Sequence, residues 1–275
     1  SHMTIGDLAE LFEKQKVVMV DSEKEYQAIL EPLPLDRHRY FVIACQEKSD
    51  DLKPNLAAIR VAAMLSSSGL ILGPTIETKA SGILTGWDSV SLFNYFYGIS
   101  PLGKTNIFVN FDTAKLMEFC SIYELWTKHD NDAFDLLSRI NEFQGLRRLE
   151  RNSKFLVLGC FSIIESIITH KPDPKDPYES LTRQICRKMI LLSKRFNEPF
   201  DYSKFKEPDA IKIWKMLYHY RSIIAHGDTA DFKKDKDLRP LQGQDVVLTF
   251  LHTTTRLLLL QALKEPVLIK DLREC

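Results

Sequence analysis

The chain has 275 residues, 44% of them apolar and 27% charged, and its 37 lysines and arginines equal its 37 aspartates and glutamates. This composition is typical of a globular protein with enough apolar residues for a core, and the length allows one large domain or two ordinary ones. No apolar run approaches the eighteen or so residues that span a bilayer, and no signal peptide opens the chain. We therefore expect a cytoplasmic protein without a membrane partner.

Five cysteines are spread along the chain, an odd number with no C-x-x-C pair and no zinc-ligand spacing. Such cysteines are typical of free thiols in a reducing cytosol. We therefore expect no metal and no cofactor. The five are Cys45, Cys120, Cys160, Cys186 and Cys275.

The first 111 residues contain short apolar segments separated by prolines and glycines. Segments of this kind, bounded by turn residues, are typical of strands. They predict a small β-rich N-terminal domain over residues 1–111. The candidate strands are residues 16–20, 39–45, 70–72, 82–84, 92–97 and 107–111.

From Asp112 onward apolar residues recur every three or four positions, which is the period of a helix. This pattern predicts an all-α domain over residues 112–275 and an α+β fold class for the whole chain. The expected helices cover residues 116–126, 134–148, 152–169, 178–196, 208–226 and 245–263.

One segment, Gly98–Thr105, fits the pattern of a phosphate-binding loop, G-x-x-x-x-G-K-[ST]. Such a loop must lead from a strand into a helix, so that backbone N–H groups and the helix dipole meet the phosphates. Here residues 106–111 read as a strand, and Pro101 lacks an N–H that the loop would use. A hairpin connection is therefore favoured over nucleotide binding.

The helix over 208–226 carries the strongest candidate site. Gly227 suits the position just after a helix end, so the helix should stop there. Arg221 lies just off the buried face, and His226 lies in the last turn, where free carbonyls favour a protonated imidazole. Together they could hold a phosphate and move a proton. The apolar face consists of Ile213, Leu217, Tyr220 and Ile224.

Local geometry alone does not bring Arg221 and His226 together. Five residues apart, they differ by about 140° around an ideal helix. They converge only if the helix end opens or a ligand bridges them. The alternative interpretation is a helix end capped by His226, with Arg221 in a surface ion pair.

Glu165 interrupts an otherwise apolar helix, where burial without a partner would be costly. Together with neighbouring hydroxyl side chains, Glu165 forms a polar stripe along the helix. One interpretation is plain solvent exposure. The other is that the stripe faces the cleft of Arg221 and His226, with Glu165 orienting Arg221. The stripe consists of Ser162, Glu165, Ser166 and Thr169.

Basic residues form two clusters in the helical half. Residues 112–275 hold 27 lysines and arginines against 24 acidic residues, whereas residues 1–111 hold 10 against 13. Charged outer faces usually serve solvation, but these clusters could follow a phosphate backbone. One consists of Arg183, Arg187, Lys188, Lys194 and Arg195, and the other of Arg147, Arg148, Arg151 and Lys154.

The segment YRSIIAHG, in which Arg221-x4-His226 closes a helix, resembles the signature of the HEPN superfamily, with the Apea-like HEPN domains as the nearest branch. The similarity extends upstream to FLVLGCFSIIESIITH and a basic helix, and downstream to a closing helix near LKEPVLIKDL. It covers about the C-terminal half. The resemblance implies metal-independent RNA cleavage that leaves a 2′,3′-cyclic phosphate and a 5′-hydroxyl. The expected setting is bacterial antiphage defence or toxin-like growth arrest.

The resemblance also implies roles for single residues. Arg221 would stabilise charge on the phosphoryl oxygens, and His226 would transfer protons as general acid or base. Ser222 and Glu165 would position them, although Ser222 departs from the Asn, Asp or His that often follows the arginine in active members. The residues expected to contact RNA are Arg183, Arg187, Lys188 and Tyr220.

The resemblance further implies a homodimer through the helical half, because the Arg–His pair usually lines a cleft between two protomers. Three aromatic residues of this helix, Trp214, Tyr218 and Tyr220, exceed what one buried seam needs and suit an interface. The N-terminal domain would bind a trigger or restrain the nuclease. The alternative is a non-catalytic HEPN module that binds RNA or dimerises.

Overall fold

The computed structural model describes residues 49–67, 76–78, 84–86, 112–129, 135–146, 149–150, 153–172, 180–196 and 199–275. The chain divides into two compact units, Ser1–Leu56 and Ala57–Cys275. Nearly all the described residues belong to the second unit.

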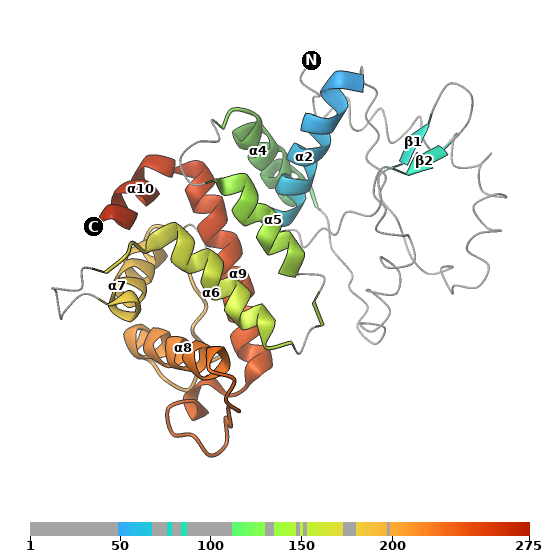
Figure 1. Ribbon diagram of the computed structural model, residues 1–275. Helices are drawn as coiled ribbons and strands as arrows, with labels where there is room; N and C mark the ends of the chain where they lie inside the picture. The colour runs from blue at the N-terminus through green and yellow to red at the C-terminus, as the bar shows by residue number, and fades with distance from the viewer. Residues whose placement is uncertain are drawn as a thin grey trace, which may run out of the picture. The chain divides into compact units, whose positions relative to one another are not determined.

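Two apolar helices, α6 (Phe155–Ile168) and α9 (Gln244–Lys264), pack against each other at the centre of the second unit (Figure 1). Every residue of α9 from Thr254 to Leu263 is buried. A helix with buried residues on all sides must have neighbours on all sides. These neighbours include α4 (Thr113–Thr127), α5 (Leu136–Leu146) and α10 (Pro266–Glu274).

Helices α7 (Leu181–Ser193) and α8 (Ala210–Ala225) form a second packed pair, and both also contact α6. The short helix η2 (Arg239–Leu241) contacts α8 and α9. Side chains cap the first turns: Asp112, Ser180 and Asp209 accept hydrogen bonds from backbone N–H groups of α4, α7 and α8. Each bond satisfies a donor that the helix itself leaves unpaired.

The helices predicted for residues 112–275 are confirmed where the structure describes them, with ends shifted by a few residues. A separate helix, α10, follows α9. It begins at Pro266 because proline has no N–H with which to continue the hydrogen-bond ladder of α9.

The predicted β-rich N-terminal domain, and with it the α+β fold class, is wrong for the described residues. Residues in this region form α2 (Ser49–Leu65), a helix of 17 residues whose alanine-rich second half favours helix formation. The described strands, β1 (Ile76–Thr78) and β2 (Leu84–Gly86), form one antiparallel pair of three residues each. Such a pair is too small to be a sheet domain.

Most of the other predictions for the N-terminal half concern residues outside the described ranges, and one predicted strand touches them. Strand β2 begins at Leu84, the last residue of the predicted strand 82–84. The remaining predicted strands and the Gly98–Thr105 segment lie outside the described residues.

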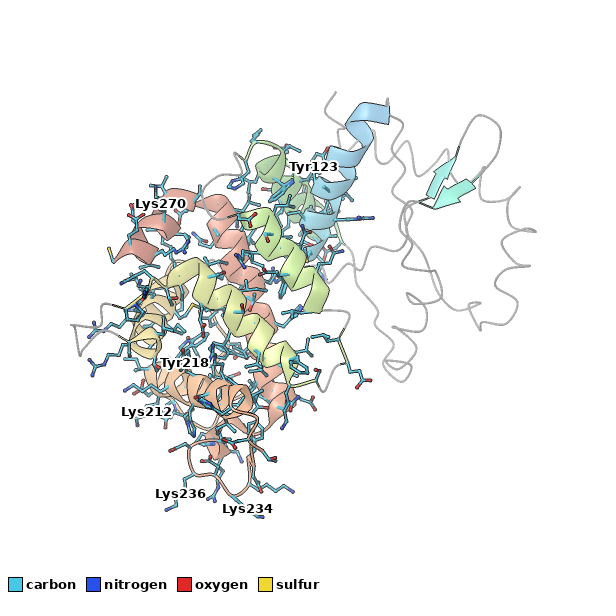
Figure 2. The ribbon with its side chains drawn as sticks, in the orientation of Figure 1. Tyr123, Lys212, Tyr218, Lys234, Lys236 and Lys270 are labelled. Atoms are coloured by element: carbon cyan, nitrogen blue, oxygen red, sulfur yellow. The ribbon has the colours of Figure 1, made fainter. Side chains whose placement is uncertain are left out.

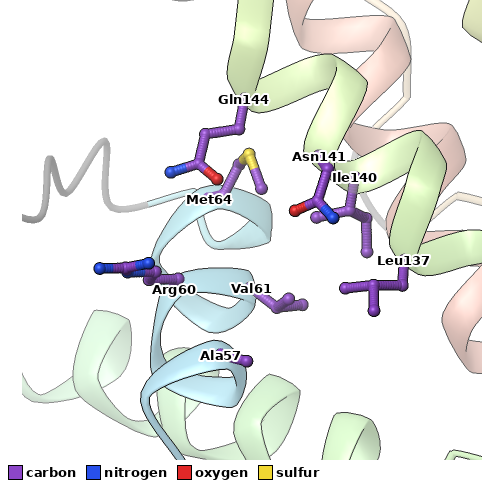
Figure 3. A pocket seen from close by; sticks show the side chains of 8 residues that line it. All are labelled: Ala57, Arg60, Val61, Met64, Leu137, Ile140, Asn141 and Gln144. Carbon is purple, nitrogen blue, oxygen red and sulfur yellow. The ribbon is translucent and has the colours of Figure 1, made fainter. Parts of the chain in front are cut away.

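From Ala57 onward, α2 belongs to the helical unit. The carbonyl of Leu65 accepts a hydrogen bond of 2.8 Å from Arg256 on α9, and Ser67 donates to Glu118 on α4. A cleft of about 80 Å³ separates α2 from α5, with Met64 and Ile140 on its walls (Figure 3). The compact helical unit therefore includes residues well before Asp112.

Helix α9 is also long and apolar enough to cross a membrane, by length and composition alone. Its most apolar window is 72% buried inside the protein, as in the core helix of a soluble protein. The described part of the chain thus uses this helix as its core.

Four cysteines fall within the described residues, and all four are free thiols, as predicted. Burial raises the pKa of Cys160 and of Cys186 to about 11. Because the thiolate is the reactive form, these two thiols are unreactive near neutral pH.

Candidate functional site

The register of α8 positions the candidate site. The predicted apolar face is confirmed, because Ile213, Leu217, Tyr220 and Ile224 are all buried. With this face turned into the core, Tyr218 and Arg221 lie at the edge of the buried face. Figure 2 shows Tyr218 on α8, on the side of that helix toward α6.

Arg221 forms an ion pair with Glu165 of α6. The Arg221 Nη2 donates to Glu165 Oε2 at 3.3 Å, and Arg221 Nε lies 3.3 Å from Glu165 Oε1. Both Nε and Oε1 are buried, but they are not aligned for a hydrogen bond. The side chains are 30% and 17% exposed, so the pair sits at the edge of the core. The structure thus brings together two residues that the sequence analysis linked.

Tyr218 completes this cluster, which we call the Glu165 cluster: Glu165, Tyr218 and Arg221. The guanidinium carbon of Arg221 lies 5.5 Å from the centre of the Tyr218 ring, within the range of a cation–π contact. The same ring meets Phe161 edge to face, with centres 5.7 Å apart. The Tyr218 ring thus contacts Phe161 and Arg221, and Arg221 contacts both Tyr218 and Glu165.

Burial sets the ionisation of the Glu165 cluster. It raises the pKa of Glu165 above its ordinary value, although the charge of Arg221 and hydrogen bonds from Arg221 and Tyr218 act in the opposite direction. Burial and the nearby Glu165 charge also raise the pKa of the Tyr218 hydroxyl. Tyr218 is thus a neutral donor at neutral pH, held close to the carboxylate.

His226 occupies the cap of α8, where the helix closes tightly. Its N–H donates to the carbonyl of Ser222 at 3.1 Å, and Gly227 follows with φ +81°. The N–H groups of Gly227 and Asp228 donate to Ile224 and Ile223, which is the Schellman arrangement. The prediction that the helix ends at Gly227 is confirmed.

The imidazole of His226 is exposed, and it makes no hydrogen bond or ion pair with any residue that the structure describes. The closed turn at the end of α8 does not bring the side chain of His226 toward Arg221. The guanidinium faces Glu165, and no described contact joins the two residues of the motif. Arg221 and His226 could converge if the helix end opened or if a ligand bridged them. Since the helix end is closed, a bridging ligand is the remaining way.

The remaining members of the polar stripe differ in exposure. Ser162 is exposed, whereas the hydroxyls of Ser166 and Thr169 donate to carbonyls of their own helix. Ser222 is half-exposed and lies next to Arg221. Ser162 is therefore the fully exposed member of the stripe, Glu165 and Ser166 are half-buried, and Thr169 is buried.

Two of the four residues predicted to contact RNA are buried, so that prediction is wrong for them. The Lys188 ammonium lies inside, 3.2 Å from the carbonyl of Arg273 at the end of α10. The Tyr220 hydroxyl donates to Gln244, and burial raises the pKa of Tyr220 to about 12. Arg183 and Arg187 are exposed on α7, as expected.

The other predicted basic residues are surface residues where they are described. Lys194 and Lys154 are exposed, and Arg195 is paired with Glu265 at 2.7 Å. Arg147, Arg148 and Arg151 lie outside the described residues. The exposed basic face of α7 therefore reduces to Arg183, Arg187 and Lys194.

The aromatic argument for a dimer interface is also wrong for two of its three residues. Trp214 is fully buried and donates through its indole N–H to Tyr202 at 3.0 Å, and Tyr220 is buried as well. Of the three, only Tyr218 is partly accessible, and it belongs to the Glu165 cluster.

Sequence reasoning missed the role of Tyr218 beside Arg221. The available signal was its position three residues before Arg221, since residues at i and i+3 are neighbours on a helix surface. Sequence reasoning also missed a group formed by His219, Asp235 and Asp237. No local signal links these residues, because a loop brings the two aspartates back to α8.

Comparisons of the chain with protein-family models, curated proteins and solved structures found no match.

Proposed function

We propose that the chain is a metal-independent endoribonuclease of the HEPN type, acting in the cytoplasm in antiphage defence or growth arrest. The observation that supports this best is the Glu165 cluster, whose Arg221 lies in the same last turns of α8 as the exposed His226. An ion-paired arginine and an unengaged imidazole at one helix end are the groups that phosphodiester cleavage requires.

In this proposal the 2′-hydroxyl of the RNA attacks the adjacent phosphorus, and the 5′-oxygen leaves. Arg221 stabilises the charge on the phosphoryl oxygens. His226 exchanges protons with the attacking or leaving oxygen. Glu165 and Tyr218 hold Arg221, and Ser222 offers a hydroxyl between the arginine and the histidine. Arg183 and Arg187, both exposed on α7, contact phosphates farther along the RNA.

A second candidate function is a non-catalytic RNA-binding or dimerisation module. The observation that favours it is the closed helix end, which leaves His226 and Arg221 apart within one protomer. A second protomer or the RNA itself would have to complete the site. We therefore propose a homodimer through the helical half, with the N-terminal half receiving a trigger or a regulator.

The deciding experiment is RNA cleavage by the His226→Ala variant. General acid–base groups contribute about 10²–10⁴-fold to rate, so cleavage should fall by that factor while RNA binding persists. Arg221→Ala should weaken both RNA binding and RNA cleavage, because an arginine–phosphate contact acts before and during the reaction. All assays include EDTA, structured and unstructured RNA, and the exposed neighbour Thr229→Ala as a control that retains cleavage.

Two results separate the candidate functions. Wild-type protein that binds RNA without cutting it points to the non-catalytic module. Cleavage by a folded His226→Ala variant at the wild-type rate shows that this histidine only caps the helix, and it refutes the catalytic proposal.

A further inference from the structure

An imidazole and two carboxylates meet on the side of α8 away from Arg221. His219 precedes Arg221 by two residues, which places it about 200° around the helix. Donor atoms of His219, Asp235 and Asp237 all lie within 4.8 Å of one another. Among the residues that the structure describes, this is the one group of three such side chains arranged in this way.

The spacing of the donor atoms suits an ion better than a direct contact. His219 Nε2 lies 3.8 Å from Asp235 Oδ2, beyond the 2.7–3.2 Å of a hydrogen bond. Zinc binds histidine nitrogen and carboxylate oxygen at about 2.0–2.2 Å, so an ion between these two atoms would reach both. Asp237 is exposed and free to close the remaining distance with a small side-chain movement.

The loop that carries the aspartates is held in place. Asp235 Oδ1 accepts the N–H of Asp237 at 2.8 Å, which leaves Oδ2 directed at His219. The ring of Phe232 packs against Tyr220 of α8, with ring centres 4.9 Å apart. Figure 2 shows Lys234 in the same loop, and its ammonium pairs with Asp231 rather than with the two site carboxylates. The loop therefore holds Asp235 near His219 before any ion arrives, and only Asp237 has to move.

We propose that His219, Asp235 and Asp237 bind a divalent transition-metal ion of the zinc class, which joins α8 to the loop 228–240. An imidazole nitrogen favours such ions over magnesium and calcium, which prefer oxygen ligands alone. Three protein ligands and a water complete a four-coordinate site. The ion links α8 to the loop, and no part in RNA cleavage is assigned to it. It lies across the helix from the Glu165 cluster and does not depend on the ribonuclease proposal.

The test is a titration of the chelator-treated full chain with zinc chloride, followed by calorimetry and by thermal unfolding. We expect one ion per chain and a rise in melting temperature, because an ion that binds only the folded state stabilises it. His219→Ala and Asp237→Asn should each weaken binding at least tenfold. Asp231→Asn, in the same loop, and His226→Ala, the other exposed imidazole of this region, should retain zinc binding.

Two outcomes would overturn the proposal. One is the absence of stoichiometric binding at zinc concentrations up to about 100 µM, where a site of useful affinity would be occupied. The other is equal binding by wild type and His219→Ala, which would assign the ion to other side chains. Neither result bears on RNA cleavage, which is measured in EDTA.

Discussion

At the scale of single residues, the environment of Glu165 determines how the candidate site is charged. An exposed ion pair contributes about 0–1 kcal/mol, whereas breaking a fully buried pair by removing one partner costs about 3–5 kcal/mol. With side-chain exposures of 17% and 30%, the Glu165–Arg221 pair lies between these cases. The contribution of this pair to the free energy of unfolding should therefore depend on whether Glu165 is protonated.

The pH dependence of Glu165→Gln tests this environment. A carboxyl whose pKa is raised by folding binds protons more readily in the folded state, so its contribution to stability falls as pH rises. The fall begins near the ordinary glutamate pKa of about 4.3 and ends above the raised pKa. Because glutamine does not titrate, the variant should gain stability relative to wild type as pH rises through this window.

The measurement is denaturant unfolding of both proteins at several pH values from about 4 to 7. Glu142→Gln is the matched control, since Glu142 pairs with Arg139 at 2.8 Å on the surface of α5. Comparing the two glutamine variants separates the effect of a half-buried carboxyl from that of a surface one. If wild type instead gained stability relative to Glu165→Gln as pH rises, Arg221, and not burial, would dominate the pKa of Glu165.

At the scale of secondary-structure elements, the end of α8 decides where His226 lies. The Schellman arrangement requires a left-handed residue after the cap, and Gly227 supplies it with φ +81°. The same closure keeps His226 at the surface and the helix end intact. A residue with a Cβ at this position would have to strain or reopen the turn.

Gly227→Ala should therefore lower the free energy of unfolding by about 1–2 kcal/mol, the cost of a left-handed conformation for a residue with a Cβ. The matched control is Gly145→Ala on α5, where an added Cβ meets no atom within 4 Å. Alanine is the better helix former, so that variant should gain about 0.5–1 kcal/mol. Urea unfolding measures the free energy of unfolding of both variants. Equal shifts in the same direction would contradict the left-handed conformation of Gly227.

At the scale of the whole molecule, the C-terminal helices depend on α2. Arg256 is buried on α9 and donates to the carbonyl of Leu65, and residues 61–65 are almost fully buried. Removing α2 would expose both the arginine and apolar side chains that now lie in the core. Buried polar groups that lose their partner cost about 1–3 kcal/mol each.

We predict that a fragment of residues 112–275 folds as a helical domain but is less stable than one of residues 49–275. Circular dichroism should show helix in both, and the shorter fragment should unfold at a lower urea midpoint because it lacks α2. Equal midpoints would show that α2 does not stabilise the helical unit. An unfolded shorter fragment would contradict a domain boundary at Asp112.

The proposed homodimer is tested by light scattering at micromolar concentration. A dimer should have about twice the 31.7 kDa mass of the chain. A second protomer would offer its own His226 to the Arg221 of the first, which the closed helix end prevents within one chain. A strictly monomeric mass would contradict the dimer and leave RNA as the remaining bridge between the two residues.

The sequence alone determined the features that depend on local interactions. Helical period and a glycine after the last turn identified the helices of residues 112–275 and the end of α8. For Glu165 the sequence left two interpretations open, solvent exposure or a contact with Arg221, and the structure has the contact with Arg221. Lys188 is an exception: it lies three residues after Ile185 on the inner face of α7, whereas its charge had placed it among the predicted RNA contacts.

Only the tertiary structure decided which faces meet. An alanine-rich helix was mistaken for part of a β-rich domain, because short apolar segments do not reveal whether they will pair with strands or pack against helices. The indole of Trp214 went to the core, because the neighbours of α8 cover that side. His219 meets Asp235 and Asp237 because the loop between them folds back on α8, and the position of a loop depends on contacts distant in sequence, here those of Phe232 with Tyr220.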